Sequence, residues 1–285
     1  MDSSYGGMPS PIIRRKDGTT KMFPLPIPVD QKQSSTKYSE VVLFDDFTAW
    51  DFITTNKPNF PKHSSEYCHL DPDISQSTLR NRDQNWEVGF GQDHIAQSHL
   101  AKHKVNEGDI FLFFGWFQYA EYINGNYKFI KNDEFPDGFH SIYAYLQIKE
   151  SHTIKEKKYP ESLKEHPHAK FHDNFKTHSQ NNNTIYTAKE SLTIEGNVLQ
   201  VKGSDYFEFN EKLILTKRGQ KYRSIWELPL AFHPRYGVEI TYNASNRWNE
   251  ETERAILQSA YRGQEFVCTK DPNKEVENWC LEFIR

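Results

Sequence analysis

Two apolar runs near the middle of the chain constrain its fold more than any other feature. Residues 110–117 follow a Gly108-Asp109 turn and are mostly aromatic or branched, and residues 141–148 form a second run of the same kind. Runs this short and this aromatic are typical of buried strands rather than helices. The stretch between them contains Asn124-Gly125, a pair that favours a tight hairpin turn. We therefore expect the two runs to be neighbouring strands of a sheet.

The segments before these runs indicate one helix and one extended arm. Ile95, Ala96 and Leu100 recur at helical spacing, which predicts a helix over residues 93–104. Prolines and glycines interrupt residues 1–38 so often that neither a helix nor a central strand is expected there. The apolar residues between the prolines favour an ordered arm laid across the fold.

The rest of the pattern indicates a single α+β domain over residues 1–285. Its expected core is a small mixed β-barrel or sheet with a few flanking helices and long loops. Residues 152–180 are polar and histidine-rich, which is typical of a surface loop. Further helices are expected at residues 39–53 and 250–261, and short strands at residues 67–73, 184–188, 213–216 and 224–228.

Composition limits the classes of partner. The chain has 285 residues with 35 Lys and Arg against 39 Asp and Glu, so it lacks the positive excess of a protein that binds duplex DNA by bulk charge. Any nucleic-acid contact must come from a local patch. Cys68, Cys268 and Cys280 have neither an even count nor a metal-binding spacing, and we expect reduced thiols in a cytoplasmic protein. We expect no membrane span and no obligate protein partner.

Polar and aromatic side chains around the first apolar run suit recognition of a heterocycle. Gln92, His99 and His103 share one helical face, and amide and imidazole groups both donate and accept hydrogen bonds, as a base edge requires. The alternative is an amphipathic helix with its polar side in water. Trp116 and Phe117 end the apolar run and would form a stacking floor, or else pack in the core.

Carboxylates near turns are the candidate catalytic groups. Asp71 and Asp73 flank Pro72, where turn chemistry is the simpler reading. Asp2 is a further candidate, and Ser3, Tyr5 and Gly6 follow it closely, where a glycine would let the backbone approach a ligand. Breaking the bond between a base and its sugar develops positive charge on the sugar, which a nearby carboxylate stabilises while it orients the attacking water.

The histidines of the polar loop do not match a metal-binding pattern. The residues His166, His168, His172 and His178 have no recognised zinc spacing and no accompanying cysteine. We therefore expect no metal and no cofactor, and His168 is interpreted as a substrate contact. Asn183, just before a predicted strand, would bind a ligand or cap a turn.

Short blocks along nearly the whole chain occur in the order of a known family pattern. They are Asp2 to Gly7 with Pro9 to Ile12, Leu25 to Pro28, His69 to Asp73, Phe90 to Gln92, Gln97 to Leu100, Gly108-Asp109 with Phe111 to Phe117, His166 to His168, Asn182 to Thr184 with Tyr186, Trp226 to Pro229, and Gln264 to Val267. In these ordered blocks the sequence resembles the third family of nucleotide-modification-associated domains, which occurs in phages and bacteria near base-modification and defence genes. In the family pattern a short strand and a basic stretch precede the Asp-Ser block, whereas here Met1 directly precedes Asp2, so either the natural chain starts upstream or this member lacks that strand.

The resemblance implies a link to modified bases in DNA, and the Gly-Asp turn with its two strands is similar to base-reading barrels of the pseudouridine-synthase-associated superfamily. The leading hypothesis is a DNA glycosylase-like hydrolase acting on phage DNA in antiviral defence. The alternatives are a non-catalytic reader of modified bases and an enzyme of modified-nucleotide metabolism. The expected catalytic residues are Asp2 and Asp71, and the expected base-binding residues are Ser3, Tyr5, Gly6, Gln92, Gln97, His99, Trp116, Phe117, His168 and Asn183.

Overall fold

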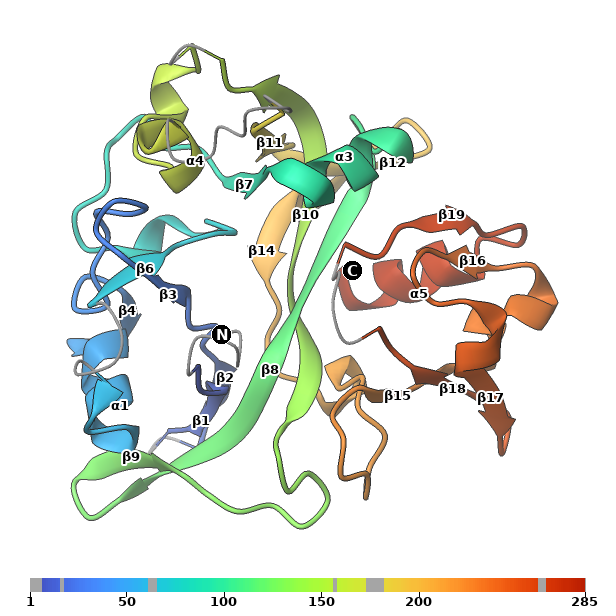
Figure 1. Ribbon diagram of the computed structural model, residues 1–285, viewed down its shortest axis with the longest axis horizontal. Coiled ribbons are helices and arrows are strands. Elements are labelled where there is room, and N and C mark those ends of the chain that lie inside the picture. Colours follow the sequence, from blue (N-terminus) through green and yellow to red (C-terminus); the bar gives the residue numbers. More distant parts are fainter. Residues whose placement is uncertain are drawn as a thin grey trace.

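Two long antiparallel strands, β8 (Ile110–Ile123) and β10 (Phe139–Thr153), cross the whole molecule and form the centre of its main sheet (Figure 1). The structure is a computed structural model that describes residues 7–15, 18–60, 66–155, 158–172, 182–260 and 265–284. The order of the main path is β2-β1-β8-β10-β11-β7, with β9 paired to β8 and β14 paired to β10. Because β1 runs parallel to β8 and the other pairs are antiparallel, the sheet is mixed.

The other strands of this sheet are short. Four pairs of strands and one three-stranded sheet surround it. The main-sheet strands are β1 (Ser10–Arg14), β2 (Thr20–Met22), β7 (Gly89–Gln92), β9 (Asn126–Phe129), β11 (Thr184–Ala188) and β14 (Ser204–Tyr206). The four pairs are two-stranded sheets, of which only the second and third are hairpins: β3 (Ile27–Val29) with β6 (Tyr67–His69), β4 (Val42–Phe44) with β5 (Phe47–Thr48), β12 (Ser191–Ile194) with β13 (Asn197–Lys202), and β16 (Glu239–Ile240) with β19 (Cys268–Lys270). The small sheet has the order β15 (Ile225–Pro229), β18 (Arg254–Gln258), β17 (Trp248–Glu251).

Helices lie around the edges of the sheet (Figure 1). They are α1 (Ala49–Asn56), α3 (His94–Lys102), α4 (Pro167–Lys170) and α5 (Glu275–Ile284). None of the helices in the described ranges is both long and apolar enough to cross a membrane. The α+β class is confirmed, and the core is an open sheet rather than a closed barrel, because the described strand path ends at β2 on one side and β7 on the other.

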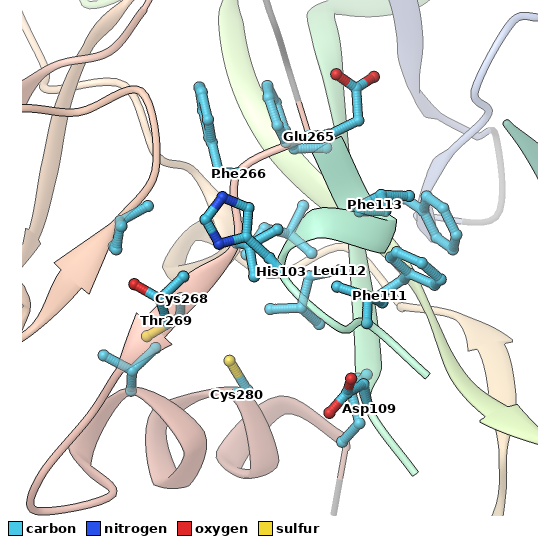
Figure 2. Close-up of a pocket in the computed structure, with 18 of the residues that line it drawn as sticks. His103, Asp109, Phe111, Leu112, Phe113, Glu265, Phe266, Cys268, Thr269 and Cys280 are labelled. Atoms are coloured by element: carbon cyan, nitrogen blue, oxygen red, sulfur yellow. The ribbon is translucent and has the colours of Figure 1, made fainter. Parts of the chain in front are cut away.

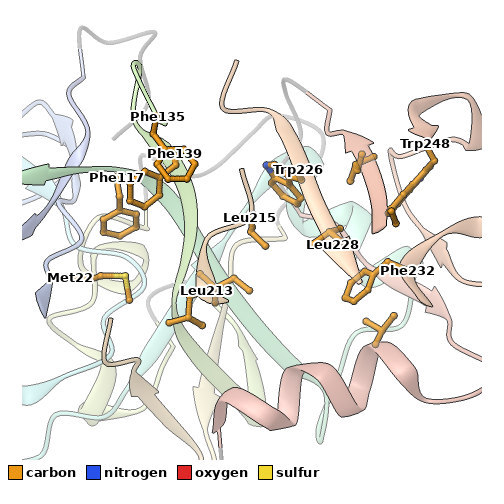
Figure 3. Packing of buried hydrophobic residues seen from close by; sticks show 14 of the residues in the cluster. Met22, Phe117, Phe135, Phe139, Leu213, Leu215, Trp226, Leu228, Phe232 and Trp248 are labelled. Carbon is orange, nitrogen blue, oxygen red and sulfur yellow. The ribbon is translucent and has the colours of Figure 1, made fainter. Parts of the chain in front are cut away.

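The core lies in separate blocks on the two sides of the β8–β10 pair. One block packs Phe117 and Phe139 of the long strands with the small C-terminal sheet, where Trp226 and Leu228 point inward (Figure 3). Another block packs α1 against the N-terminal strands. This division places the C-terminal segments beside one face of β8, and that placement forms the site described below.

The predicted strands at residues 110–117, 141–148 and 184–188 and the predicted helix at residues 93–104 are confirmed, although β8 and β10 extend beyond their apolar runs. The predicted helix at residues 250–261 is wrong. Residues 248–258 form the β17–β18 hairpin, which turns at Thr252 and Glu253, both with positive φ. β18 is the central strand between β15 and β17, and residues 255–257 are all buried, so both faces of the strand are covered. This pairing decides the conformation, although the acidic residues at the start of the segment resemble a helix N-terminus.

Three further expectations need correction. Residues 39–53 form β4 and β5 before α1 begins at Ala49, because Thr48 caps the helix and exchanges hydrogen bonds with Asp51. Pro11 lies in β1, an interior strand, where its carbonyl still accepts from the Phe23 N–H at 3.0 Å. The loop at residues 152–180 is not all surface, because α4 buries residues 166–169.

Candidate functional site

A cleft of about 870 Å³ lies between β8 and the C-terminal segments (Figure 2). Residues 111–114 of β8 line it from both faces of the strand, Phe114 stacks on Phe266 of the segment before β19, and Cys280 of α5 lies across from the start of β8. The cleft continues toward the small C-terminal sheet, where Trp226 lines it. Most of this wall is aromatic and flat-sided, which suits the faces of a planar ligand.

Polar groups are arranged around this aromatic wall. Gln92, at the end of β7, donates from Nε2 to Glu265 Oε1 at 3.4 Å, so two side chains that are far apart in sequence meet at the wall. His103, just after α3, projects into the same space (Figure 2). Lys102 and Lys104 on either side of it also line the cleft. Amide, carboxylate, imidazole and ammonium groups thus surround an apolar interior, the usual design of a small-ligand site.

A buried carboxylate surrounded by three imidazoles adjoins the cleft. Asp71 follows β6, and its side chain is only 6% exposed. Its Oδ1 accepts from the Gly91 N–H at 2.9 Å and lies 3.6 Å from His166 Nε2. Its Oδ2 lies 3.6 Å from His69 Nε2 and 3.5 Å from His168 Nε2. This group, named here the Asp71 cluster, comprises Asp71, His69, His166 and His168.

The Asp71 cluster keeps its carboxylate ionised. Burial alone would raise the pKa of Asp71, but the neighbouring imidazoles, those of His166 and His69 first, hold it well below its usual range. Burial lowers the pKa of His168 to about 3, so its imidazole is neutral at neutral pH. The site therefore combines a permanent negative charge with at least one neutral ring nitrogen.

Local sequence explains how imidazoles fit against β7. A Cβ at Gly91 would lie 2.3 Å from His168 Cδ2, and a Cβ at Gly89 would lie 3.0 Å from His166 Cδ2. Neither glycine has a positive φ, so space rather than backbone conformation requires them. Asn183, just before β11, completes the packing: its Nδ2 donates to the His168 carbonyl at 2.8 Å and its Oδ1 lies 2.6 Å from His168 Nδ1.

The cluster and the cleft are direct neighbours. Pro72 and Gln92, which follow Asp71 and Gly91 in sequence, both line the cleft. Tyr143 also lines it, and while burial is the main cause of its strongly raised pKa, the charge of Asp71 contributes as well. The carboxylate therefore lies within electrostatic reach of a group in the cleft wall.

The structure brings only some of the predicted site residues together. Gln92 lines the cleft, and Asp71, His168 and Asn183 meet behind it. His99 instead pairs with Thr241 Oγ1 at 3.0 Å and stacks on Tyr242, and it does not line the cleft.

The remaining predicted residues lie elsewhere or outside the described ranges. Gln97 is buried and accepts from the Tyr186 hydroxyl at 2.9 Å, which makes it part of the core. Phe117 is fully buried in the core, as the alternative reading expects, and Trp116 lies under the Arg223 guanidinium. Neither lines the cleft: Phe117 lies on the same face of β8 as Phe111 and Phe113 but further along the strand, and Trp116 lies on the opposite face. Asp2, Ser3, Tyr5 and Gly6 lie outside the described residues.

Sequence reasoning missed His69, His166, Phe266 and Glu265. The signal for the first two was present as two similar triplets, His69-Leu70-Asp71 and His166-Pro167-His168, each with two ionisable side chains separated by one residue. The sequence does not show that the two triplets meet in the fold, because nearly a hundred residues lie between them. The groups at His69, Asp71 and His168 lie within 4.8 Å of one another and could hold a metal ion, although local histidine spacing had predicted none.

Together, these features define an α+β protein with an open mixed sheet, an aromatic-lined cleft and a buried carboxylate cluster beside it. Residues 1–269 match the family model described as nucleotide modification associated domain 3. The match covers most of the chain, so the protein belongs to this family, as the ordered sequence blocks predicted. No curated protein and no solved structure matches the chain.

Proposed function

We propose that this protein binds a modified nucleobase in the aromatic cleft and hydrolyses the N-glycosidic bond that joins the base to deoxyribose in DNA. The observation that carries the proposal is the ionised Asp71 carboxylate directly behind a large aromatic cleft. Membership of a nucleotide-modification family supports the choice of ligand. The protein would act on modified phage DNA, in keeping with a role in antiviral defence.

The dimensions and lining of the cleft suit an extruded base. A volume of about 870 Å³ lies near the upper end of typical ligand pockets, so it leaves room for a bulky substituent on the base. Stacking on an aromatic side chain contributes about 1–3 kcal/mol per base, which offsets a flipping cost of a few kcal/mol. Gln92 and Glu265 supply a donor and an acceptor for the polar edge of the base.

Asp71 would act on the sugar in the proposed hydrolysis. As the glycosidic bond breaks, positive charge grows on the sugar, and a fixed carboxylate nearby stabilises it or orients the attacking water. Because the pKa of Asp71 is held low, the group is available as an anion throughout the physiological range. Asp2 remains a second candidate for this role.

One observation favours a second function, a reader that binds the modified base without cutting it. The Asp71 side chain is only 6% exposed, and its Oδ1 already accepts from the Gly91 N–H. A cleft that uses only its aromatic wall and polar rim would recognise a base without needing this carboxylate.

The test compares two duplexes of one sequence, with and without glucosylated 5-hydroxymethylcytosine, and measures released base by mass spectrometry and abasic sites by strand cleavage. We expect release from the modified duplex only, and loss of release but not of binding in Asp71→Asn. Asp109→Asn is the matched control, because Asp109 is a carboxylate of the same cleft away from the cluster. Asp2→Asn is measured alongside.

The outcomes separate the hypotheses. Tight and selective binding with no released base supports the reader. Turnover of a free modified nucleotide without DNA binding supports an enzyme of nucleotide metabolism. Release that persists in both Asp71→Asn and Asp2→Asn refutes the assignment of the carboxylate.

A further inference from the structure

We propose that His69, Asp71 and His168 bind a divalent first-row transition-metal ion, such as zinc or iron. The three ligand atoms come from β6, the turn after it and α4, and they lie within 4.8 Å of one another. This inference goes beyond the proposed function, with which it shares Asp71, and it is tested separately because metal binding is measured without any nucleic acid.

The distances inside the cluster are wrong for direct hydrogen bonds and right for a shared ion. A hydrogen bond between a charged nitrogen donor and a carboxylate is about 2.7–2.9 Å long. Both imidazole contacts to Asp71 Oδ2 are 3.5–3.6 Å, although the side chains are at most 12% exposed. Two ligands that each lie about 2.0 Å from a tetrahedral ion are about 3.3 Å apart. The spacing leaves room for a cation between the three groups.

The hydrogen bonds of Asn183 fix which nitrogen of His168 faces the carboxylate. The amide orientation is set because Nδ2 donates to the His168 carbonyl at 2.8 Å. Asn183 Oδ1 therefore accepts from the His168 Nδ1–H at 2.6 Å, and Nε2 is the nitrogen that faces Asp71 Oδ2. An imidazole oriented through its other nitrogen is the usual arrangement around a bound metal.

A second observation points the same way on the other side of the carboxylate. His166 is 4% exposed, and its Nε2 has no hydrogen-bond partner among the described residues. It lies 3.6 Å from Asp71 Oδ1, too far for a normal hydrogen bond. A buried polar nitrogen without a partner is costly. A metal-bound water or a fourth coordination bond would satisfy it.

The donor set selects the class of ion. Magnesium and calcium prefer oxygen ligands only, whereas two imidazoles and one carboxylate suit zinc and iron. Three protein ligands leave coordination positions open, as in catalytic rather than structural metal sites. Pro72 and Gln92 join the cluster to the cleft wall, so an open position would lie near the proposed ligand site. Asn183 is a positioning residue because it acts through His168.

The test uses untagged full-length protein, stripped with a chelator and titrated with zinc by calorimetry and with cobalt by visible absorption. We expect one ion per chain and a cobalt spectrum with nitrogen and oxygen ligands in a tetrahedral or five-coordinate site. Asp71→Asn and His168→Ala should lose this binding, and Asn183→Ala should weaken it about 10–100-fold. The control is His233→Ala, because His233 caps a short helix in the C-terminal part of the chain.

The result that would overturn the proposal is clear even if a variant fails to fold. Wild-type protein that binds neither zinc nor cobalt nor ferrous iron at micromolar concentration refutes it. Unchanged binding in folded Asp71→Asn and His168→Ala also refutes it and places the ion elsewhere. Metal binding without any release of base keeps the metal site and removes only the glycosylase proposal.

Discussion

Replacement of Gly91 by alanine tests the geometry of the Asp71 cluster more sharply than removal of any of its members. The new Cβ would lie 2.3 Å from His168 Cδ2 and 2.5 Å from Cγ, whereas ordinary contacts begin at 3.4 Å. The imidazole must therefore move by about 1 Å, because the three nearest atoms all belong to the buried, planar ring of His168 rather than to the end of a flexible chain. A shift of that size lengthens the 2.6 Å bond to Asn183.

The expected cost follows from these two effects. Overpacking of a close-packed site costs about 1–3 kcal/mol, and weakening a buried hydrogen bond adds about 1 kcal/mol. We expect Gly91→Ala to lose about 2–4 kcal/mol of unfolding free energy. The measurement is equilibrium urea unfolding followed by tryptophan fluorescence, with zinc affinity and base release measured on the same preparation.

Two other glycines provide matched controls. Gly89→Ala brings its Cβ to 3.0 Å from His166 Cδ2, so its effect should be smaller than that of Gly91→Ala. Gly196 has φ +80° and no atom within 4 Å of the added Cβ, so its alanine variant should lose only about 1 kcal/mol to backbone strain and keep zinc binding. A Gly91→Ala protein as stable as wild type, with unchanged zinc affinity, would refute the reasoning about the cluster.

Three further predictions concern other parts of the chain. Burial and the charge of Arg223 lower the pKa of His140 to about 3, from 6.5 in an exposed histidine. The unfolded chain therefore binds a proton at this residue more readily than the folded chain does, and the free energy of unfolding should fall as the pH drops below 6.5. Between pH 7 and pH 5, the free energy of unfolding measured in urea should fall by about 1–2 kcal/mol more in wild type than in His140→Gln. Equal falls in the two proteins would contradict this. Arg82 donates two 2.6 Å hydrogen bonds to the buried Asp73 carboxylate. Arg82→Met removes this partner and should lower the free energy of unfolding by about 3–5 kcal/mol in the same assay. Arg80→Met, which breaks an exposed ion pair, should be nearly neutral. Phe266 lines the cleft, and Phe266→Ala should weaken binding of the modified duplex, measured by fluorescence anisotropy, by about 1–3 kcal/mol. Tyr236→Ala, at an exposed position outside the cleft, should leave the affinity unchanged. Equal affinities of wild type and Phe266→Ala would exclude stacking on Phe266.

The sequence alone predicts the parts of the fold that local pattern determines. The two apolar runs, the Asn124-Gly125 turn and the helix before Gly108 all follow from short-range spacing, and the structure has each of them. The helix predicted at residues 250–261 fails for the opposite reason. Pairing of β18 with both β15 and β17 decides its conformation, and no feature of residues 250–261 alone shows that pairing.

The site divides in the same way. Asp71 and Gln92 could be singled out from their residue types and their places beside a turn and a strand end. The cluster itself could not, because β6 and α4 meet only once β7 lies between them with glycines at positions 89 and 91. Trp116 and Phe117 show a further limit: they lie on opposite faces of β8, and the sequence does not state how far along the strand the cleft extends.

The most direct test of the central claim is a crystal structure of the Asp71→Asn variant with an oligonucleotide that carries glucosylated 5-hydroxymethylcytosine. The account predicts the modified base inside the cleft, stacked on Phe266, with Gln92 at its polar edge and the sugar toward position 71. A base bound on another face of the molecule, or a cleft that stays empty while the DNA binds elsewhere, would contradict it.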